Sequence, residues 1–279
     1  MILKIPNKLL EINYKKLIIK RGTNMAGRLE GKVIVILGAS DERSMGAATA
    51  HRCAAEGAKL VLAARRLDRV QAIADSIGAV AVGCDITDEV QLAALADAAI
   101  SHYGKLDGAI NFAGIETSSP IADISREVLQ ENCDVHLIGT TLFIKHMTAR
   151  MTDGGSVVTT SSQTALLAPP GLAAYAGTKS GADHIVRIAA VEYGAQNIRV
   201  NSLSPGFTPS AMTESFLAMP AIEQAFLNEI PLGKLPSTDD MANAALWLLS
   251  DECFMTGRLL DISGGQTLRR IPTATEMGF

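Results

Sequence analysis

Residues 33–46 read VIVILGASDERSMG. Its first five residues, Val33–Leu37, are all apolar, which predicts a strand buried on both faces. Gly38 and Gly46 follow, and an alanine-rich helical pattern begins at the second glycine. A glycine turn between a strand and a helix lets a phosphate group approach backbone N–H groups at the start of the helix. The stretch therefore predicts the first strand–helix junction of a parallel sheet, although a tight turn needs glycine even without a phosphate.

Short apolar runs alternate with helical patterns through the rest of the chain. Further strands are expected at 59–63, 80–82, 108–112, 155–161, 199–203 and 259–262, and helices at 46–56, 67–77, about 88–103, 125–151 and 172–193. This alternation predicts an α/β fold, a Rossmann-type doubly wound parallel sheet of about seven strands with helices on both faces. The long irregular segment 205–236, with two short helices, is the expected substrate loop, because open α/β sheets bind ligands beyond their strand ends.

Composition restricts the class of protein and its partners. The chain has 279 residues, of which 48% are hydrophobic and 19% charged, enough for one large domain with a substantial core. A net charge of −4 argues against nucleic acid as a partner. The four cysteines show no metal-ligand spacing, so we expect free thiols, no metal and a cytoplasmic location.

Residues 1–24 differ from the remainder, with six basic residues against one acidic residue. They contain no apolar run long enough for a secretory signal or a membrane span. A transit peptide is an alternative, but the segment lacks serine and is rich in lysine rather than arginine. We interpret 1–24 as a basic extension or an upstream translation start, and 25–279 as a single domain.

Tyr175 and Lys179 are candidates for proton transfer. They are four residues apart in a predicted helix, so they lie on the same face, and Ser162 precedes the tyrosine by thirteen residues. A nearby ammonium favours the phenolate, which predicts a phenol pKa lowered toward neutral pH. Such a phenol exchanges a proton with a carbonyl or alcohol oxygen that a serine hydroxyl can hold. The same spacing also occurs in a surface Tyr/Lys pair on an amphipathic helix.

The end of the second strand indicates which dinucleotide is preferred. An acid there would hold the ribose 2′-hydroxyl of NAD, but this chain has Arg65 and Arg66 instead. Guanidinium groups suit a 2′-phosphate, and Arg43 in the glycine loop is a further candidate contact. We therefore expect NADP(H) rather than NAD(H), with solvated arginines at a helix start as the alternative.

Together these residues resemble the short-chain dehydrogenase/reductase family over about 31–265. The similarity includes the glycine turn, Asp85, the Asn111–Gly114 segment, the Ser162/Tyr175/Lys179 set, Asn201, Pro205-Gly206, and the C-terminal pairs Thr256-Gly257 and Ser263–Gly265. The resemblance implies that Lys179 holds the nicotinamide ribose, Tyr175 acts as general acid, and Ser162 holds the carbonyl oxygen. It implies these cofactor contacts: Gly38, Ser40, Arg43, Ser44, Met45, Gly46, Arg65, Arg66, Asp85, Ile86, Asn111, Ala113, Gly114, Tyr175, Lys179, Pro205, Gly206 and Ser210.

The chain departs from the family pattern in four places. Leu37 replaces a threonine, Phe112 replaces an asparagine, and the glycine loop is two residues longer, with Ser44 where a glycine is usual. His136 stands where the family has a catalytic asparagine that supports a water-mediated proton relay. Histidine can donate and accept hydrogen bonds, so His136 is either a relay residue or a buried packing residue.

The resemblance implies an NADP(H)-dependent oxidoreductase that interconverts a ketone and a secondary alcohol. The loop after Pro205 is apolar and has few charges, which favours a small, uncharged, apolar substrate. Enoyl reductases of this fold space the tyrosine and lysine seven apart, where this chain has Ala182. The alternative is a non-catalytic NADPH-binding regulatory protein. We expect a homotetramer or dimer, as is usual in the family, and no membrane partner.

Overall fold

The computed structural model describes residues 27–278, so the predicted extension 1–24 lies outside the described residues. The described chain forms one sheet of seven parallel strands in the order β3-β2-β1-β4-β5-β6-β7. The strands are β1 (Val33–Leu37), β2 (Lys59–Ala64), β3 (Val80–Gly83), β4 (Gly108–Asn111), β5 (Gly155–Thr160), β6 (Ile198–Pro205) and β7 (Leu259–Ile262). The predicted fold class and each predicted strand are thereby confirmed.

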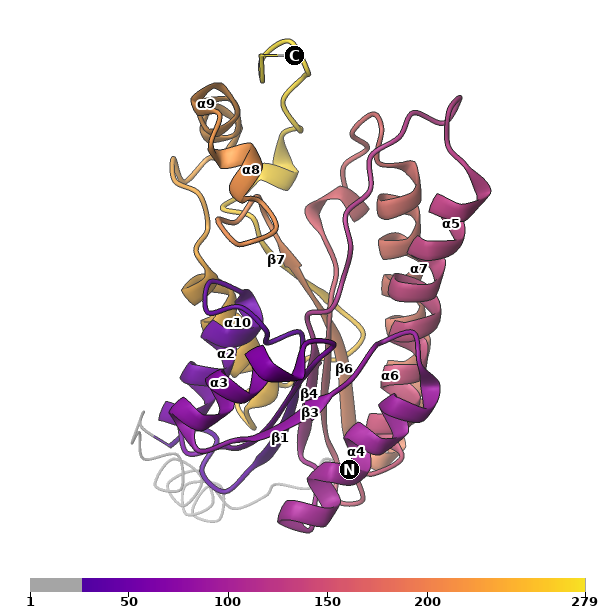
Figure 1. The fold of residues 1–279 in the computed structure, drawn as a ribbon, viewed down its shortest axis with the longest axis vertical. Coiled ribbons are helices and arrows are strands. Elements are labelled where there is room, and N and C mark those ends of the chain that lie inside the picture. Colours follow the sequence, from indigo (N-terminus) through magenta and orange to yellow (C-terminus); the bar gives the residue numbers. More distant parts are fainter. Residues whose placement is uncertain (1–26, 279) are drawn as a thin grey trace, which may run out of the picture.

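Helices cover the sheet on both faces (Figure 1). One layer contains α2 (Met45–Ala55), α3 (Leu67–Ile77) and α10 (Thr238–Leu249). The other contains α4 (Glu89–Tyr103), α6 (Gly139–Thr148) and α7 (Ala173–Tyr193). The side chains of β1 are buried on both faces of the sheet. Val33, Val35 and Leu37 pack against the second helical layer, whereas Ile34 and Ile36 pack against the first. Side chains of one strand alternate between faces, so a strand covered on both needs apolar residues at every position.

The order in which successive strands join the sheet reverses at β1, which pairs with β2 on one side and with β4 on the other. Crossovers from β1 and β4 leave in opposite directions, so their carboxyl ends open a crevice between the helical layers. Ligands of open α/β sheets bind at such a switch point. The glycine turn, the ends of β2 and β3, and residues 111–114 all meet at this edge.

The predicted helix 125–151 is divided into three parts. It consists of α5 (Arg126–Asn132), a π-helical segment η1 (Cys133–Ile138) and α6. Gly139 follows the π-helical segment and lies so close to the loop between β3 and α4 that a Cβ there would be 2.7 Å from the carbonyl oxygen of Ile86. A π-helical segment adds a residue to a helical turn and is frequent near functional sites. Here it carries His136 toward the carboxyl edge of the sheet.

The segment after β6 contains the two short helices that were expected, α8 (Glu214–Leu217) and α9 (Pro220–Glu229). Both lie above the carboxyl edge of the sheet, beside the last described residues of the chain (Figure 1). Within residues 27–278, no helix combines the length and the apolar character needed to cross a membrane.

Candidate active site

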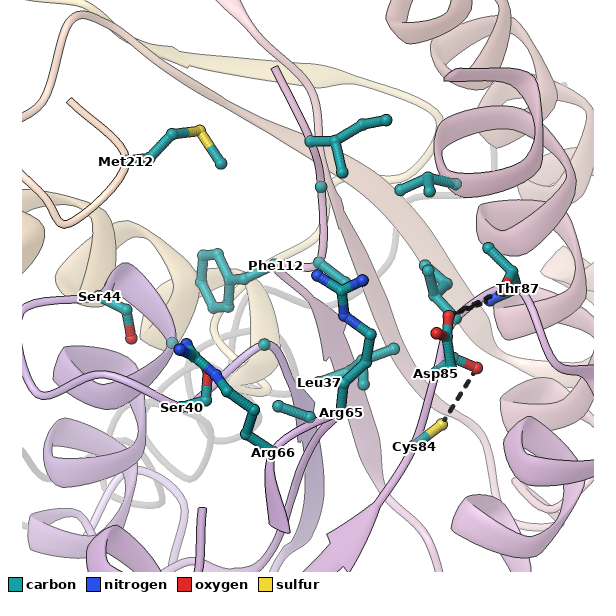
Figure 2. Close-up of a pocket in the computed structure, with 18 of the residues that line it drawn as sticks. Leu37, Ser40, Ser44, Arg65, Arg66, Cys84, Asp85, Thr87, Phe112 and Met212 are labelled. Carbon is teal, nitrogen blue, oxygen red and sulfur yellow. Dashed lines mark hydrogen bonds between the residues drawn. The ribbon is translucent and has the colours of Figure 1, made fainter. Parts of the chain in front are cut away.

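A cavity of about 1330 Å³ opens at the switch point (Figure 2). Its walls come from the β1–α2 turn, the ends of β2, β3 and β4, and the start of α5. Of the predicted cofactor contacts, the following line it: Gly38, Ser40, Ser44, Met45, Gly46, Arg65, Arg66, Asp85, Ile86, Ala113, Gly114 and Ser210. Twelve of the eighteen predicted cofactor contacts therefore lie together around this cavity.

The geometry of the glycine turn explains why Gly38 is required and why a serine is accommodated at position 44. Gly38 has φ +101°, and a Cβ there would lie 2.8 Å from the carbonyl carbon of Phe112, so only glycine fits. Ser44 is the N-cap of α2, and its side chain accepts a hydrogen bond from the Ala47 N–H at 3.0 Å. A serine in this place therefore stabilises the start of the helix whose N-terminus faces the cavity.

Three arginines lie along the end of β2 and the start of α3. The guanidinium of Arg66 donates to Ser40 Oγ at 3.1 Å, and Figure 2 shows the Arg65 and Arg66 side chains rising into the cavity. Arg65 has no side-chain hydrogen bond or ion pair with another described residue. Arg69, which the sequence reasoning missed, also lines the cavity. Arg69 lies in the first turn of the helix predicted at 67–77, directly after Arg65 and Arg66, and this position was the available signal.

Arg43, predicted as a cofactor contact, does not line this cavity. Its guanidinium pairs with Glu214 of α8 at 2.8 Å and with Asp41 at 3.4 Å. The ion pair with Glu214 connects the glycine loop to α8, and Arg43 does not join Arg65 and Arg66 in the cavity lining. The predicted contact between Arg43 and a 2′-phosphate stays a prediction.

Asn111 also lies outside the cavity lining, although it was predicted as a contact. It is buried at the end of β4, where its Oδ1 accepts from the Ala113 N–H at 2.8 Å and its amide donates to Thr140 at 3.4 Å. It thus shapes the turn that carries Ala113 and Gly114. Asp85 does line the cavity, and its carboxylate accepts from the backbone and hydroxyl of Thr87 (Figure 2).

A second cavity of about 460 Å³ adjoins the first. The residues Met45, Phe112, Gly114, Ile115, Ser210 and Met212 line both. The second cavity holds Ser162, Tyr175 and Lys179, together with Pro205 and Gly206 of the predicted set. The cavity that holds Ser162, Tyr175 and Lys179 therefore shares a wall with the larger cavity, as expected if a dinucleotide binds beside the proton-transfer residues.

The lid over the second cavity is apolar. Phe207 and Phe226 stack with ring centroids 4.0 Å apart, and both line the cavity. The last described residues complete the wall through Ile271, Ala274 and Met277. Sequence reasoning missed this contribution, because nothing in the pattern of 266–278 indicates which surface the segment covers.

The C-terminal wall is tied down by two arginines. Arg269 donates to the backbone carbonyl of Asn228 at 2.8 Å, and Arg270 pairs with Glu229 at 2.8 Å and with Glu276 at 2.7 Å. These contacts attach the segment to the end of α9, so the lid and the chain end form one side of the cavity.

Burial dominates the ionisation of the proton-transfer residues. Burial, with a smaller contribution from the Glu116 charge, raises the pKa of Tyr175 to about 12 against the opposing effect of the Ser162 hydroxyl. The Lys179 ammonium lies 5.8 Å from the tyrosine ring centroid and donates to the Thr160 carbonyl at 2.7 Å. Burial lowers the pKa of this lysine to about 8. The direction of the Tyr175 pKa shift is opposite to the lowered phenol pKa that the sequence predicts, because burial disfavours the phenolate more than the Ser162 hydroxyl favours it.

His136 is buried behind this group and lines neither cavity. Its Nε2 accepts from the Ile115 N–H at 3.1 Å, which assigns the proton to Nδ1, 3.2 Å from Thr178 Oγ1. The ring meets Tyr175 edge to face at 5.3 Å between centroids. Burial and the Lys179 charge lower the pKa of His136 to about 3, so the ring is neutral. With both nitrogens engaged by protein groups, these contacts favour the packing alternative over the relay.

Two carboxylates near the site were not predicted from the sequence. Asp183 is buried one turn beyond Lys179 and accepts from Ser161 at 2.6 Å. Glu116 lines the second cavity two residues after Gly114. The spacing of Asp183 on the helix carrying Lys179 was a usable signal, whereas a glutamate in a loop gives none. No cluster of three or more potential metal ligands occurs in the described part of the chain.

Comparisons with known proteins agree with this geometry. Residues 38–267 match a family model described as enoyl-(acyl carrier protein) reductase. A 2,5-dichloro-2,5-cyclohexadiene-1,4-diol dehydrogenase of Sphingobium indicum is 33% identical over 86% of this chain and 98% of its own length. A trans-4-hydroxycyclohexanecarboxylate dehydrogenase of Sinomonas cyclohexanicum is 34% identical over 88% and 96%. A solved short-chain type dehydrogenase/reductase from Mycobacterium ulcerans superimposes with a TM-score of 0.85, at 29% identity over 89% and 94% of the two chains.

Proposed function

This chain belongs to the short-chain dehydrogenase/reductase family and is an oxidoreductase acting on CH–OH groups, and we propose that it interconverts a secondary alcohol and a ketone with NADP(H). The observation that carries this proposal is the shared wall between two cavities. Tyr175, Lys179 and Ser162 line the smaller cavity, and the glycine turn and arginines line the larger. A hydride carrier in one therefore lies beside a proton donor in the other.

The larger cavity fits a phosphorylated dinucleotide. A Cβ at Gly38 would lie 2.8 Å from the backbone of Phe112, and one at Gly46 would press against the Gly38 carbonyl, so the tight turn that lines the cavity needs both glycines. Arg65, Arg66 and Arg69 supply positive charge for a 2′-phosphate. No acid of β2 competes for that place. When bound, the nicotinamide supplies the hydride, and the protein contributes orientation and proton transfer.

We assign the proton transfer to Tyr175. Its hydroxyl gives a proton to the developing alkoxide during ketone reduction and becomes a phenolate, and in the reverse direction the phenolate takes the proton from the alcohol. Ser162 holds the same oxygen. Lys179, a buried cation one turn away, opposes the burial that disfavours the phenolate and is available to the cofactor ribose.

The substrate we propose is small, uncharged and largely apolar. The lid residues Phe207, Phe216 and Phe226 support this, as does the relative named for an uncharged cyclic diol. A cytoplasmic homotetramer or dimer is the arrangement we propose for the chain, on family resemblance.

Two alternatives make different predictions. A non-catalytic NADPH-binding protein would bind the dinucleotide without turnover, but the complete Ser162/Tyr175/Lys179 set argues against it. Enoyl reduction, which the description of the matched family model raises, is disfavoured by the four-residue spacing of Tyr175 and Lys179.

The decisive experiment measures initial rates on a panel of ketones, secondary alcohols and one enoyl thioester with NADPH, NADP⁺, NADH and NAD⁺. We expect ketone and alcohol turnover with a preference for the phosphorylated cofactor. NADPH binding without turnover on any member would support the regulatory alternative, and turnover confined to the thioester would support enoyl reduction.

A further inference from the structure

Glu116 places a negative charge in a substrate cavity that is otherwise almost free of charge. Of the residues that line this cavity, only Glu116 and Lys179 carry ionisable charge at neutral pH. Lys179 is buried and donates to the Thr160 carbonyl. Glu116 has no side-chain hydrogen bond or ion pair within residues 27–278. The carboxylate is therefore available to a ligand.

The loop that carries Glu116 is held on both sides of this residue. The preceding N–H, of Ile115, donates to His136 Nε2 at 3.1 Å. The following side chain, Thr117 Oγ1, accepts from the buried Asn132 amide at 2.7 Å. Both anchors come from the α5–η1 segment, which packs against the loop. The backbone on both sides of Glu116 is thus anchored, and Glu116 is one of the residues that line the cavity.

The chemistry of this wall discriminates between ligands. Although the Glu116 side chain reaches solvent, partial burial already raises the pKa of its carboxyl group. A purely apolar ligand would remove further water from the carboxylate without replacing its hydrogen bonds, which is unfavourable. A ligand hydroxyl would replace them through a charge-assisted hydrogen bond. A ligand carboxylate would be repelled.

We propose that Glu116 selects substrates that carry a second hydroxyl group away from the reacting carbon, and that it rejects substrates that carry a carboxylate. This inference rests on the proposed function, because it assumes that the second cavity receives the alcohol or ketone. It narrows the substrate class from apolar alcohols to diols and hydroxyketones with an apolar skeleton, which the phenylalanine-rich lid covers.

The test compares kcat/KM for cyclohexanol, the 1,2-, 1,3- and 1,4-cyclohexanediols and 4-hydroxycyclohexanecarboxylate with NADP⁺. For the wild type we expect at least one diol to exceed cyclohexanol by about tenfold, the value of one charge-assisted hydrogen bond. Glu116→Ala should bring the diol-to-cyclohexanol ratio close to one, and Glu116→Gln should raise the carboxylate-to-cyclohexanol ratio by about tenfold. Ratios of rates at one pH cancel any effect of the charge on Tyr175.

Glu223→Gln is the matched control, because this carboxylate lies on the lid helix α9 but does not line the cavity. It should leave every ratio unchanged. A diol-to-cyclohexanol ratio that Glu116→Ala does not alter would overturn the inference, and so would efficient wild-type oxidation of the carboxylate substrate.

A binding measurement separates this inference from the proposed function. Calorimetric titration of diol and cyclohexanol into the NADP⁺ complex of Tyr175→Phe needs no turnover. Stronger binding of the diol that disappears in the Tyr175→Phe/Glu116→Ala double variant supports the role of Glu116, even if the wild type oxidises none of these alcohols and the proposed reaction fails. Equal binding of diol and cyclohexanol contradicts the role of Glu116, even if the wild type oxidises both.

Discussion

Arg65→Ala should weaken the binding of NADPH much more than the binding of NADH. The Arg65 guanidinium faces the larger cavity and has no side-chain partner among the described residues, so its removal breaks no contact within the protein. An exposed surface substitution of this kind changes the free energy of unfolding by less than about 0.5 kcal/mol. Any large effect on binding must therefore come from the lost contact with the cofactor.

The expected magnitude follows from the position of the side chain. A charge-assisted hydrogen bond contributes about 1.5–3 kcal/mol, and Arg65 is exposed, so the lower limit applies. The Kd for NADPH should rise about tenfold, while the Kd for NADH, which lacks the phosphate, should change by less than about twofold. Arg66→Ala should have a similar effect on NADPH, but it also removes the bond to Ser40 and so disturbs the glycine turn.

Titration of the protein into each reduced cofactor, followed by nicotinamide fluorescence, gives both dissociation constants. Arg258→Ala, an exposed arginine that does not line the cavity, controls for the change in net charge. The NADPH effect should shrink at high salt, because screening weakens exposed charge pairs. An equal loss of NADH and NADPH affinity, or no loss of either, would show that Arg65 does not read the 2′-phosphate.

Three further outcomes are expected. Tyr175→Phe should lower kcat by about 10²–10⁴-fold while NADPH binding is kept, and a smaller loss in stopped-flow rates would argue for another proton donor. Glu116→Gln should move the pH–rate profiles of both directions to lower pH, because the carboxylate raises the pKa of Tyr175; a shift to higher pH would contradict this. His136→Asn should flatten the pH dependence of urea unfolding between about pH 4 and 6 by about 1.4 kcal/mol per pH unit. The histidine pKa is lowered to about 3 on folding, so the unfolded chain binds the extra proton and wild-type stability falls with acid; an unchanged slope would assign that dependence elsewhere.

The sequence predicted the sheet well because its signal is local. Val33–Leu37 is buried on both faces, and both strand ends were read correctly from five apolar residues. The sequence could not reveal the π-helical segment Cys133–Ile138, because it depends on a long-range approach: Gly139 packs against the carbonyl of Ile86. The apolar residues repeat with the same helical period before and after such an insertion, so their pattern does not reveal it.

The positions of site residues could be predicted where the local backbone and the family spacing determine them. They could not be predicted where a side chain contacts a residue far away in the sequence. Tyr175 and Lys179 face the cavity because a helix of fixed pitch carries them. Arg43 turned outward because Glu214, far away in the sequence, offers an ion pair. The pKa of Tyr175 depends on how completely the phenol is desolvated, which the spacing of a lysine does not report.

The attachment of residues 269–277 to α9 has a practical consequence for engineering and assay design. Ile271 and Met277 line the second cavity, which we propose receives the substrate, yet they belong to no strand or helix of the sheet and its covering layers. Exchanging this short piece should retune which molecules are accepted while leaving the hydride and proton chemistry in place. For the same reason, an affinity tag fused after Met277 would lie next to the second cavity, so a purification tag should be attached elsewhere.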